Sequence, residues 1–175
     1  MLIAILEDNA FRRKMNIPYE KRWTVRVFAY NEEGKIVFLK IQGSDTFGKR
    51  DHLETIGGGV ENDESLEDTL HREVMEEIGY NCEIMEELGT VVDHYNLINR
   101  ETISTYFVVK LTDFVGDMNR SKEEMTLISG VVALSEEEAL KELSHYSKRT
   151  INELVQRRDY YALKHYMSRK TKREN

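Results

Sequence analysis

The sequence predicts an α+β domain built on one mixed β-sheet with helices packed on its faces. Strand patterns come first, then one helix, more strands, and finally further helices. No internal repeat or low-complexity linker divides the chain. Its 175 residues, 40% of them hydrophobic, suffice for one sizeable core and are few for two. We therefore expect one compact unit with additions at its ends.

Strand signals begin at the amino terminus. Residues 1–6 form an apolar run that is too short for a secretory core, so we expect an edge strand there. In residues 23–30, Trp, Val, Val and Ala alternate with Thr, Arg, Phe and Tyr, which is the two-residue period of a strand. Residues 35–41 are rich in Ile, Val, Phe and Leu. The turn at residues 31–34 joins these two runs. The pattern predicts a β-hairpin.

The next segment reads as a polar loop at residues 43–51, followed by a short strand at residues 52–56. Three consecutive glycines, residues 57–59, then rule out a regular element. Further strands are predicted at residues 82–95, 101–111 and 128–134. Further helices are predicted at residues 135–143 and 147–167.

Charge and composition exclude several classes of function. A net charge of −7 argues against nonspecific nucleic-acid binding as the main role. No apolar stretch approaches the roughly 20 residues that span a bilayer. The single cysteine, Cys82, excludes an internal disulfide and a cysteine zinc site, and it favours a reducing cytoplasm.

The carboxyl-terminal part is basic. From residue 141 onward, ten Lys or Arg face four Asp or Glu, a balance of +6. We interpret this as a solvated helix face, with RNA or an acidic partner as the alternative. Accordingly we expect a domain at residues 1–145 and a basic helix at residues 146–175, packed on the same domain or at a homodimer interface.

A well-marked helix is predicted after the glycines. Ser65 and Asp68 form a capping box at its start, and Gly79 ends it. Its apolar stripe consists of Leu66, Leu70, Val74 and Ile78. This stripe is expected to face the core.

Glutamates adjoin this stripe. At about 100° per residue, Glu73 and Glu77 fall within about 20° of Leu66 on the helical wheel, and Glu76 flanks them. Carboxylates held beside a core require a cation or a raised pKa, because an unpaired buried charge is costly. Hard divalent ions prefer oxygen ligands, so the pattern predicts Mg²⁺, with Mn²⁺ as a substitute.

The segment from Gly58 to Tyr80 resembles the Nudix box. The residues that carry this resemblance are Gly58, Glu64 and the run Arg72-Glu73-Val74-Met75-Glu76-Glu77-Ile78-Gly79-Tyr80. It departs from the usual pattern at Tyr80, normally aliphatic, and at Ile56, where many members have proline. The resemblance implies the α/β/α sandwich of that family, with a mixed β-sheet and helices on both faces.

The resemblance also implies roles for single residues. Glu73 and Glu77 would be the main metal ligands, with Glu76 in or beside the coordination sphere. A backbone carbonyl near Gly57 or Gly58 would complete it. A further pair, Glu64 and Arg72, would lock the glycine loop to the helix as structural support.

The general base and the substrate contacts remain open at this stage. The base would come from the box, at Glu76, or from the later polar segment, at Glu123 or Glu124. Glu77 is also counted among the expected catalytic residues. Residues expected to contact substrate phosphates are Gly58, Gly59, Arg26 and Lys40.

The implied function is a Mg²⁺-dependent hydrolase that acts on a small molecule. It would cleave the phosphoanhydride bond of a nucleoside diphosphate linked to another moiety. Two alternatives remain: a catalytically silent Nudix-fold nucleotide sensor, and an RNA 5′-end pyrophosphohydrolase.

Overall fold

A single mixed sheet organises the protein. The computed structural model describes residues 1–116 and 118–174. The sheet has seven strands in the order β1-β5-β6-β2-β3-β4, with β7 paired to β3. The strands are β1 (Leu2–Glu7), β2 (Glu20–Tyr30), β3 (Ile36–Asp45), β4 (Gly48–Glu54), β5 (Tyr80–Tyr95), β6 (Arg100–Phe114) and β7 (Ile128–Leu134). The helices are α1 (Leu66–Ile78), α2 (Lys122–Leu127), α3 (Glu136–Leu143) and α4 (Ile151–Glu174).

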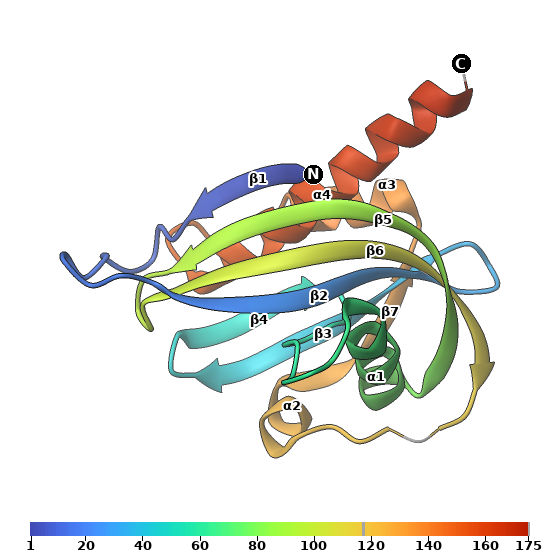
Figure 1. Ribbon diagram of the computed structural model, residues 1–175, viewed down its shortest axis with the longest axis horizontal. Coiled ribbons are helices and arrows are strands. Elements are labelled where there is room, and N and C mark those ends of the chain that lie inside the picture. The colour runs from blue at the N-terminus through green and yellow to red at the C-terminus, as the bar shows by residue number, and fades with distance from the viewer. Residues whose placement is uncertain (117, 175) are drawn as a thin grey trace.

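Helices cover both faces of the sheet, which confirms the predicted sandwich. Figure 1 shows α1 and α2 on one side and α3 and α4 on the other. The alternation along β2 separates the two cores. Val25 and Val27 lie in the cluster that includes Leu70 of α1, whereas Phe28 lies in the cluster that includes Leu154 of α4. The strand is therefore buried on both faces.

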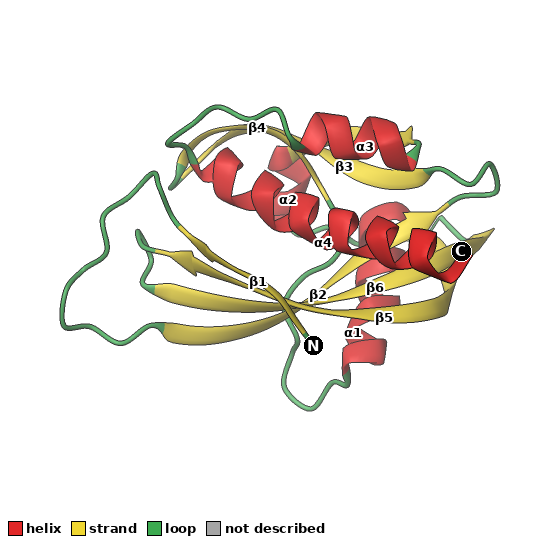
Figure 2. Cartoon of the chain, turned by 90° about the horizontal axis from the view of Figure 1, so that it is seen from above, coloured by secondary structure: helices red, strands yellow, loops and turns green. Residues whose placement is uncertain are grey.

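The predicted hairpin of β2 and β3 exists, but its strands soon separate. Their only paired residues in the described chain are Ala29 with Val37 and Tyr30 with Ile36. Figure 2 shows the two halves of the sheet diverging, with α4 lying across them. Along the rest of β2, isolated bridges attach the glycine segment: Thr24 to Gly59, and Val27 to Ile56. The separation of β2 from β3 thus makes room for the glycine loop.

Helix α1 has the ends that its sequence predicts. The Ser65 side chain accepts a hydrogen bond from the Asp68 amide, and the Asp68 carboxylate accepts one from the Ser65 amide. Gly79 closes the helix at φ 74°, a left-handed conformation that glycine adopts without steric cost. These local contacts fix the register of the glutamates on α1.

Two polar segments contain regular structure. The segment predicted as a loop at residues 43–51 holds the end of β3 and the start of β4, which pair up to Asp45 and Gly48. Its polar composition reflects exposed strands. The later polar segment contains α2, which begins at a capping box of Ser121 and Glu124. That spacing was a readable signal for a helix.

Helix α4 packs on its own chain. It contacts β1, β4, β5 and α3. Some of its basic side chains pair internally: Arg169 and Arg173 bind Glu86 at 2.6 and 2.9 Å, and Lys170 binds Glu136 at 2.8 Å. In the described part of the chain, no helix is both long and apolar enough to cross a membrane.

Candidate metal centre and adjoining cavity

Three carboxylates converge where α1 meets α2. Glu73 and Glu77 come from α1 and Glu124 comes from α2, and one oxygen of each lies within 4.8 Å of the others. The α1 pair is buried, with 6% of Glu73 and 4% of Glu77 exposed. The helix positions them because the neighbouring Leu70 and Val74 anchor α1 against the sheet. Within the described residues, Glu76 is not in this group.

The glycine loop lies directly against these carboxylates. The Gly57 amide donates a hydrogen bond of 2.9 Å to Oε2 of Glu77. A Cβ atom at Gly57 would overlap the backbone carbonyl of Val25, and one at Gly58 would overlap the carboxylate of Glu73. Gly57 is therefore required for the close approach to β2, and a side chain at Gly58 would displace the carboxylate of Glu73.

Among the described residues, one carbonyl of the glycine loop has no hydrogen-bond partner. The Gly58 oxygen accepts a hydrogen bond from the Val25 amide at 3.0 Å, and the Gly59 oxygen accepts one from Arg72 at 3.0 Å. For the Gly57 oxygen, no hydrogen bond is found in residues 1–116 or 118–174. Since the Gly57 amide is bound to Glu77 and the Gly57 carbonyl has no described hydrogen bond, this carbonyl fits an additional metal ligand better than that of Gly58.

Arg72 ties the loop to the helix. Its guanidinium donates two hydrogen bonds to Glu64, at 2.8 and 2.9 Å, and reaches Glu73 at 2.8 Å and Glu76 at 3.2 Å. Its hydrogen bonds lower the pKa of the Glu64 carboxyl to about 2. The Glu64 and Arg72 pair therefore has the geometry of the supporting role predicted for it.

The electrostatics of the centre favour a bound cation. Burial raises the pKa of Glu77 well above its ordinary value, more than the hydrogen bond from Gly57 lowers it. Burial also raises the pKa of Glu73, against the opposing effect of Arg72. A divalent ion would stabilise the charged forms of both groups. Because every side-chain donor is a carboxylate oxygen, the set fits a hard ion such as Mg²⁺.

Arg120 is a site residue that sequence reasoning missed. Its Nε and Nη2 atoms donate to the backbone carbonyl of Glu77 at 2.9 and 2.6 Å. This contact fixes the segment before α2 against the end of α1, and so helps to hold Glu124 in place. No local signal marked Arg120, because its partner is 43 residues away.

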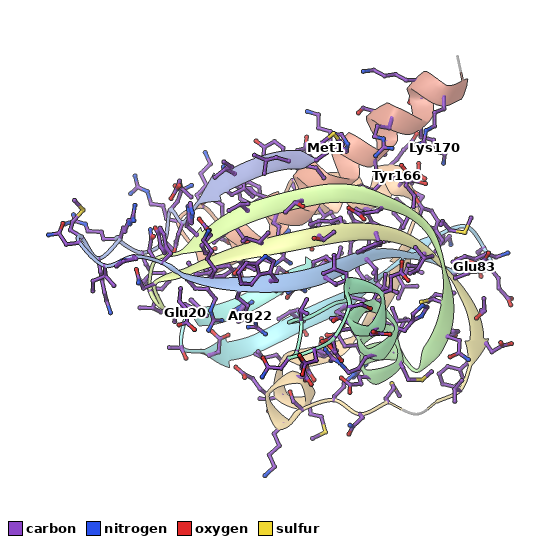
Figure 3. All side chains as sticks on the ribbon, in the orientation of Figure 1. Met1, Glu20, Arg22, Glu83, Tyr166 and Lys170 are labelled. Carbon is purple, nitrogen blue, oxygen red and sulfur yellow. The ribbon has the colours of Figure 1, made fainter. Side chains whose placement is uncertain are left out.

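A basic cavity of about 170 Å³ adjoins the carboxylate cleft. Both are lined by Arg22, Gly58 and Gly59. Figure 3 labels Arg22 near the start of β2. Of the two basic residues predicted to contact phosphates, Arg26 lines this cavity and Lys40 does not. Lys40 is exposed on β3 and borders a separate depression, so the structure does not bring it together with Arg26.

Buried ion pairs form the floor of this cavity. Arg26 binds Glu54 at 2.8 Å, and Arg158 binds Glu54 at 3.1 Å and Asp159 at 3.0 Å. Asp159 also accepts a hydrogen bond of 2.9 Å from the Thr55 amide, just before the glycines. The network therefore connects α4, β2 and β4 to the start of the loop.

Asp93 beside this network gives a stability prediction. It is fully buried on β5, and burial raises its pKa to about 6 although Arg158 and Arg26 oppose this. The unfolded value is about 3.9, so the contribution of this group to stability is complete below that pH and is lost as the pH rises through the folded value. We expect Asp93→Asn to raise the free energy of unfolding at pH 7.5 by up to about 3 kcal/mol.

Urea unfolding of wild type and variant at pH 4 and pH 7.5 tests this expectation. The gain should be confined to the higher pH, since the wild-type carboxyl is already largely protonated in the folded protein at pH 4. Asp51→Asn, at an exposed position on β4, is the matched control. A comparable destabilisation by Asp93→Asn at pH 7.5 would contradict the prediction.

A model of the NUDIX domain matches residues 20–154. The chain belongs to the NUDIX family. The match extends well beyond the box, from β2 to the first turn of α4. The family resemblance inferred from residues 58–80 is therefore confirmed.

Several solved structures share the fold of this chain. A NUDIX hydrolase from Nitrosomonas europaea is 16% identical, with a TM-score of 0.62 over 85% of this chain and 90% of that one. A MutT protein from Methanosarcina mazei Go1 is 20% identical, with a TM-score of 0.58 over 82% and 96% of the two chains. A UDP-X diphosphatase is 17% identical, with a TM-score of 0.58 over 88% and 66%. No curated protein matches the sequence significantly.

Proposed function

We propose that this NUDIX protein is a Mg²⁺-dependent hydrolase that cleaves the phosphoanhydride bond of a nucleoside diphosphate linked to another moiety. The observation that carries the proposal is the convergence of Glu73, Glu77 and Glu124 beside the glycine loop. Membership of the family supports hydrolysis of a pyrophosphate bond in general. The UDP-X diphosphatase of the same fold is consistent with a nucleotide-type substrate.

In this proposal Glu73, Glu77 and the Gly57 carbonyl hold the metal, with Mn²⁺ as a substitute for Mg²⁺. A bound divalent ion would draw charge from the phosphate oxygens and lower the pKa of a bound water. The protein's own contribution is to hold the carboxylate oxygens of Glu73 and Glu77 in place. Gly57 orients the carboxylate of Glu77, and Arg72 orients that of Glu73.

Glu124 is our candidate for the general base, in preference to Glu76. Arg72 already engages Glu76 at 3.2 Å, which disfavours proton transfer to that carboxylate. Only one oxygen of Glu124 has a described role, accepting the Ser121 amide at 2.6 Å. The other is available to accept a proton from the attacking water, and Glu124 lies within 4.8 Å of the proposed ligands Glu73 and Glu77.

We expect Glu124→Gln to lower kcat by about 100-fold or more. A glutamine oxygen still accepts the Ser121 amide, so α2 is retained. Glu76→Gln should have an effect below about 10-fold, and Glu123→Gln, the exposed neighbour on α2, should match wild type. Turnover and Mg²⁺ binding are measured for each variant. Wild-type turnover in Glu124→Gln, or a larger loss in Glu76→Gln, would reassign the base.

A substrate panel with Mg²⁺ or Mn²⁺ tests the function itself. It contains nucleoside diphosphate derivatives, nucleoside triphosphates, dinucleoside polyphosphates and 5′-triphosphate RNA. We expect cleavage of at least one small nucleotide and release of a nucleoside phosphate. If nothing in the panel is cleaved while nucleotides bind, the protein is a sensor and the proposed hydrolysis is wrong.

A further inference from the structure

The basic cavity beside the metal centre carries more positive charge than its own carboxylates neutralise. Five arginines line it: Arg22, Arg26, Arg50, Arg100 and Arg158. Three of them are paired, Arg26 and Arg158 as described above and Arg50 with Asp45 at 2.6 Å. The excess positive charge therefore comes from Arg22 and Arg100.

Arg22 and Arg100 have no partner in the described residues. Neither forms an ion pair with a carboxylate or a side-chain hydrogen bond in residues 1–116 and 118–174. They also act on each other, since burial and the positive charges of Arg100 and Arg26 lower the pKa of the Arg22 guanidinium. Glu73 and Tyr95 oppose this shift without forming a hydrogen bond or ion pair with Arg22 in the described chain. Two like charges that line one cavity without an ion-paired carboxylate are best stabilised by an anion from outside the chain.

The backbone places these two arginines on the same side of the sheet. Arg22 pairs with Thr102 across the parallel strands β2 and β6, so Arg100 lies two residues earlier on the same face. The Arg22 guanidinium rests against the loop, because a Cβ at Gly59 would lie 2.6 Å from its Nη2 atom. An anion held there would be next to a group bound at the carboxylates.

The size of the cavity limits what it accepts. Its volume of about 170 Å³ is below the roughly 300–1,000 Å³ of pockets that enclose drug-sized ligands. A whole nucleoside would not be enclosed. A single phosphate group would be, and guanidinium groups bind phosphate through charge-assisted, often bidentate hydrogen bonds.

We propose that Arg22 and Arg100 form a subsite for a phosphate of the substrate beyond the two phosphates that flank the cleaved bond. This inference rests on the proposed function and narrows its substrate class. The other moiety would be anionic: either a further phosphate in a linear chain or a phosphorylated sugar. Nucleoside diphosphates linked to a neutral sugar would be poorer substrates.

Three compounds that share an adenosine moiety and differ in their additional phosphate test the subsite. ATP carries a third phosphate in the chain, ADP-ribose 1″-phosphate carries one on the second sugar, and ADP-ribose carries none. We expect Arg22→Gln and Arg100→Gln to lower kcat/KM by about 10-fold to 100-fold for a substrate with the extra phosphate, and by less than about 3-fold for ADP-ribose. The affected compound identifies the source of the phosphate. Arg12→Gln, at an exposed loop position, is the control for lost charge.

An equal loss on all three compounds would overturn the subsite, because the arginines would then bind the reacting phosphates. A second measurement separates the subsite from the reaction. Binding of inorganic tripolyphosphate to the metal-free protein, followed by calorimetry, should weaken at least 10-fold in Arg22→Gln and stay unchanged in Arg12→Gln. Such binding without cleavage of any nucleotide would retain the subsite and refute hydrolysis. If nucleotides are cleaved but neither arginine substitution changes kcat/KM or binding, hydrolysis is retained and the subsite is refuted.

Discussion

Replacing Glu77 by glutamine is expected to lower turnover by at least about 100-fold and to weaken Mg²⁺ binding. Glutamine keeps the size of the side chain and an oxygen that accepts the Gly57 amide, but it removes the charge that attracts the metal. The carboxylate is the most deeply buried of the three in the centre, with 4% of the residue exposed. At so buried a position, water has little access to take the place of the lost carboxylate.

The stability of this variant separates a metal ligand from a structural residue. Because burial raises the pKa of Glu77 well above its ordinary value, the charged form is disfavoured in the metal-free protein. The metal-free variant should consequently unfold at the same or a higher urea concentration than wild type. Mg²⁺ should stabilise wild type and have a much smaller effect on Glu77→Gln.

The matched control is Glu67→Gln, an exposed glutamate on the same helix. It should leave turnover, Mg²⁺ binding and unfolding unchanged. Turnover of Glu77→Gln within about 3-fold of wild type would remove the carboxylate centre from the proposed reaction. A large loss of stability would instead assign Glu77 a role in folding.

Replacing Gly57 by alanine is expected to lower the free energy of unfolding by more than about 3 kcal/mol and to abolish turnover. Gly57 has φ 140°, a conformation that residues with a side chain rarely adopt. The added methyl group would also overlap the carbonyl of Val25, which is backbone and has no rotamer to change. Relief would require the loop to move away from β2 and from Glu77.

Two other glycines serve as controls that separate backbone strain from steric overlap. Gly34 has φ 73° but open space around it, so Gly34→Ala should cost about 1 kcal/mol from backbone strain alone. Gly130 has open space and no such φ, so Gly130→Ala should have little effect. Chemical unfolding of the three variants measures the differences. A cost for Gly57→Ala no larger than that for Gly34→Ala would mean that the loop tolerates displacement.

The elements specified by local contacts could be predicted from the sequence. The ends of α1 follow from Ser65, Asp68 and Gly79, which act within the helix and its flanking residues. Burial of Glu73 and Glu77 followed from their position beside Leu70 and Val74, because helical periodicity fixes which side chains share a face. The strand at Ile128–Leu134 was predicted with its observed bounds.

The places of Lys40 and Arg26 in the structure differ because they depend on how strands meet. Both are basic residues on the first hairpin. Among residues 1–116 and 118–174, the strands β2 and β3 pair at only two positions and then separate, which leaves Arg26 beside the glycine loop and Lys40 outside on β3. Nothing in the spacing of either strand specifies where two paired strands part.

By itself, the sequence determined the two buried glutamates, the glycine loop and the arginine that connects them, since all lie within 23 consecutive residues. Only the tertiary structure decided that Glu124 completes the carboxylate group. Its position depends on β5 and β6 crossing the sheet and on Arg120 fixing the following segment to α1. The basic cavity was likewise hidden, because its arginines come from β2, β4, β6 and α4. Packing brings such distant residues together, and local periodicity does not encode it.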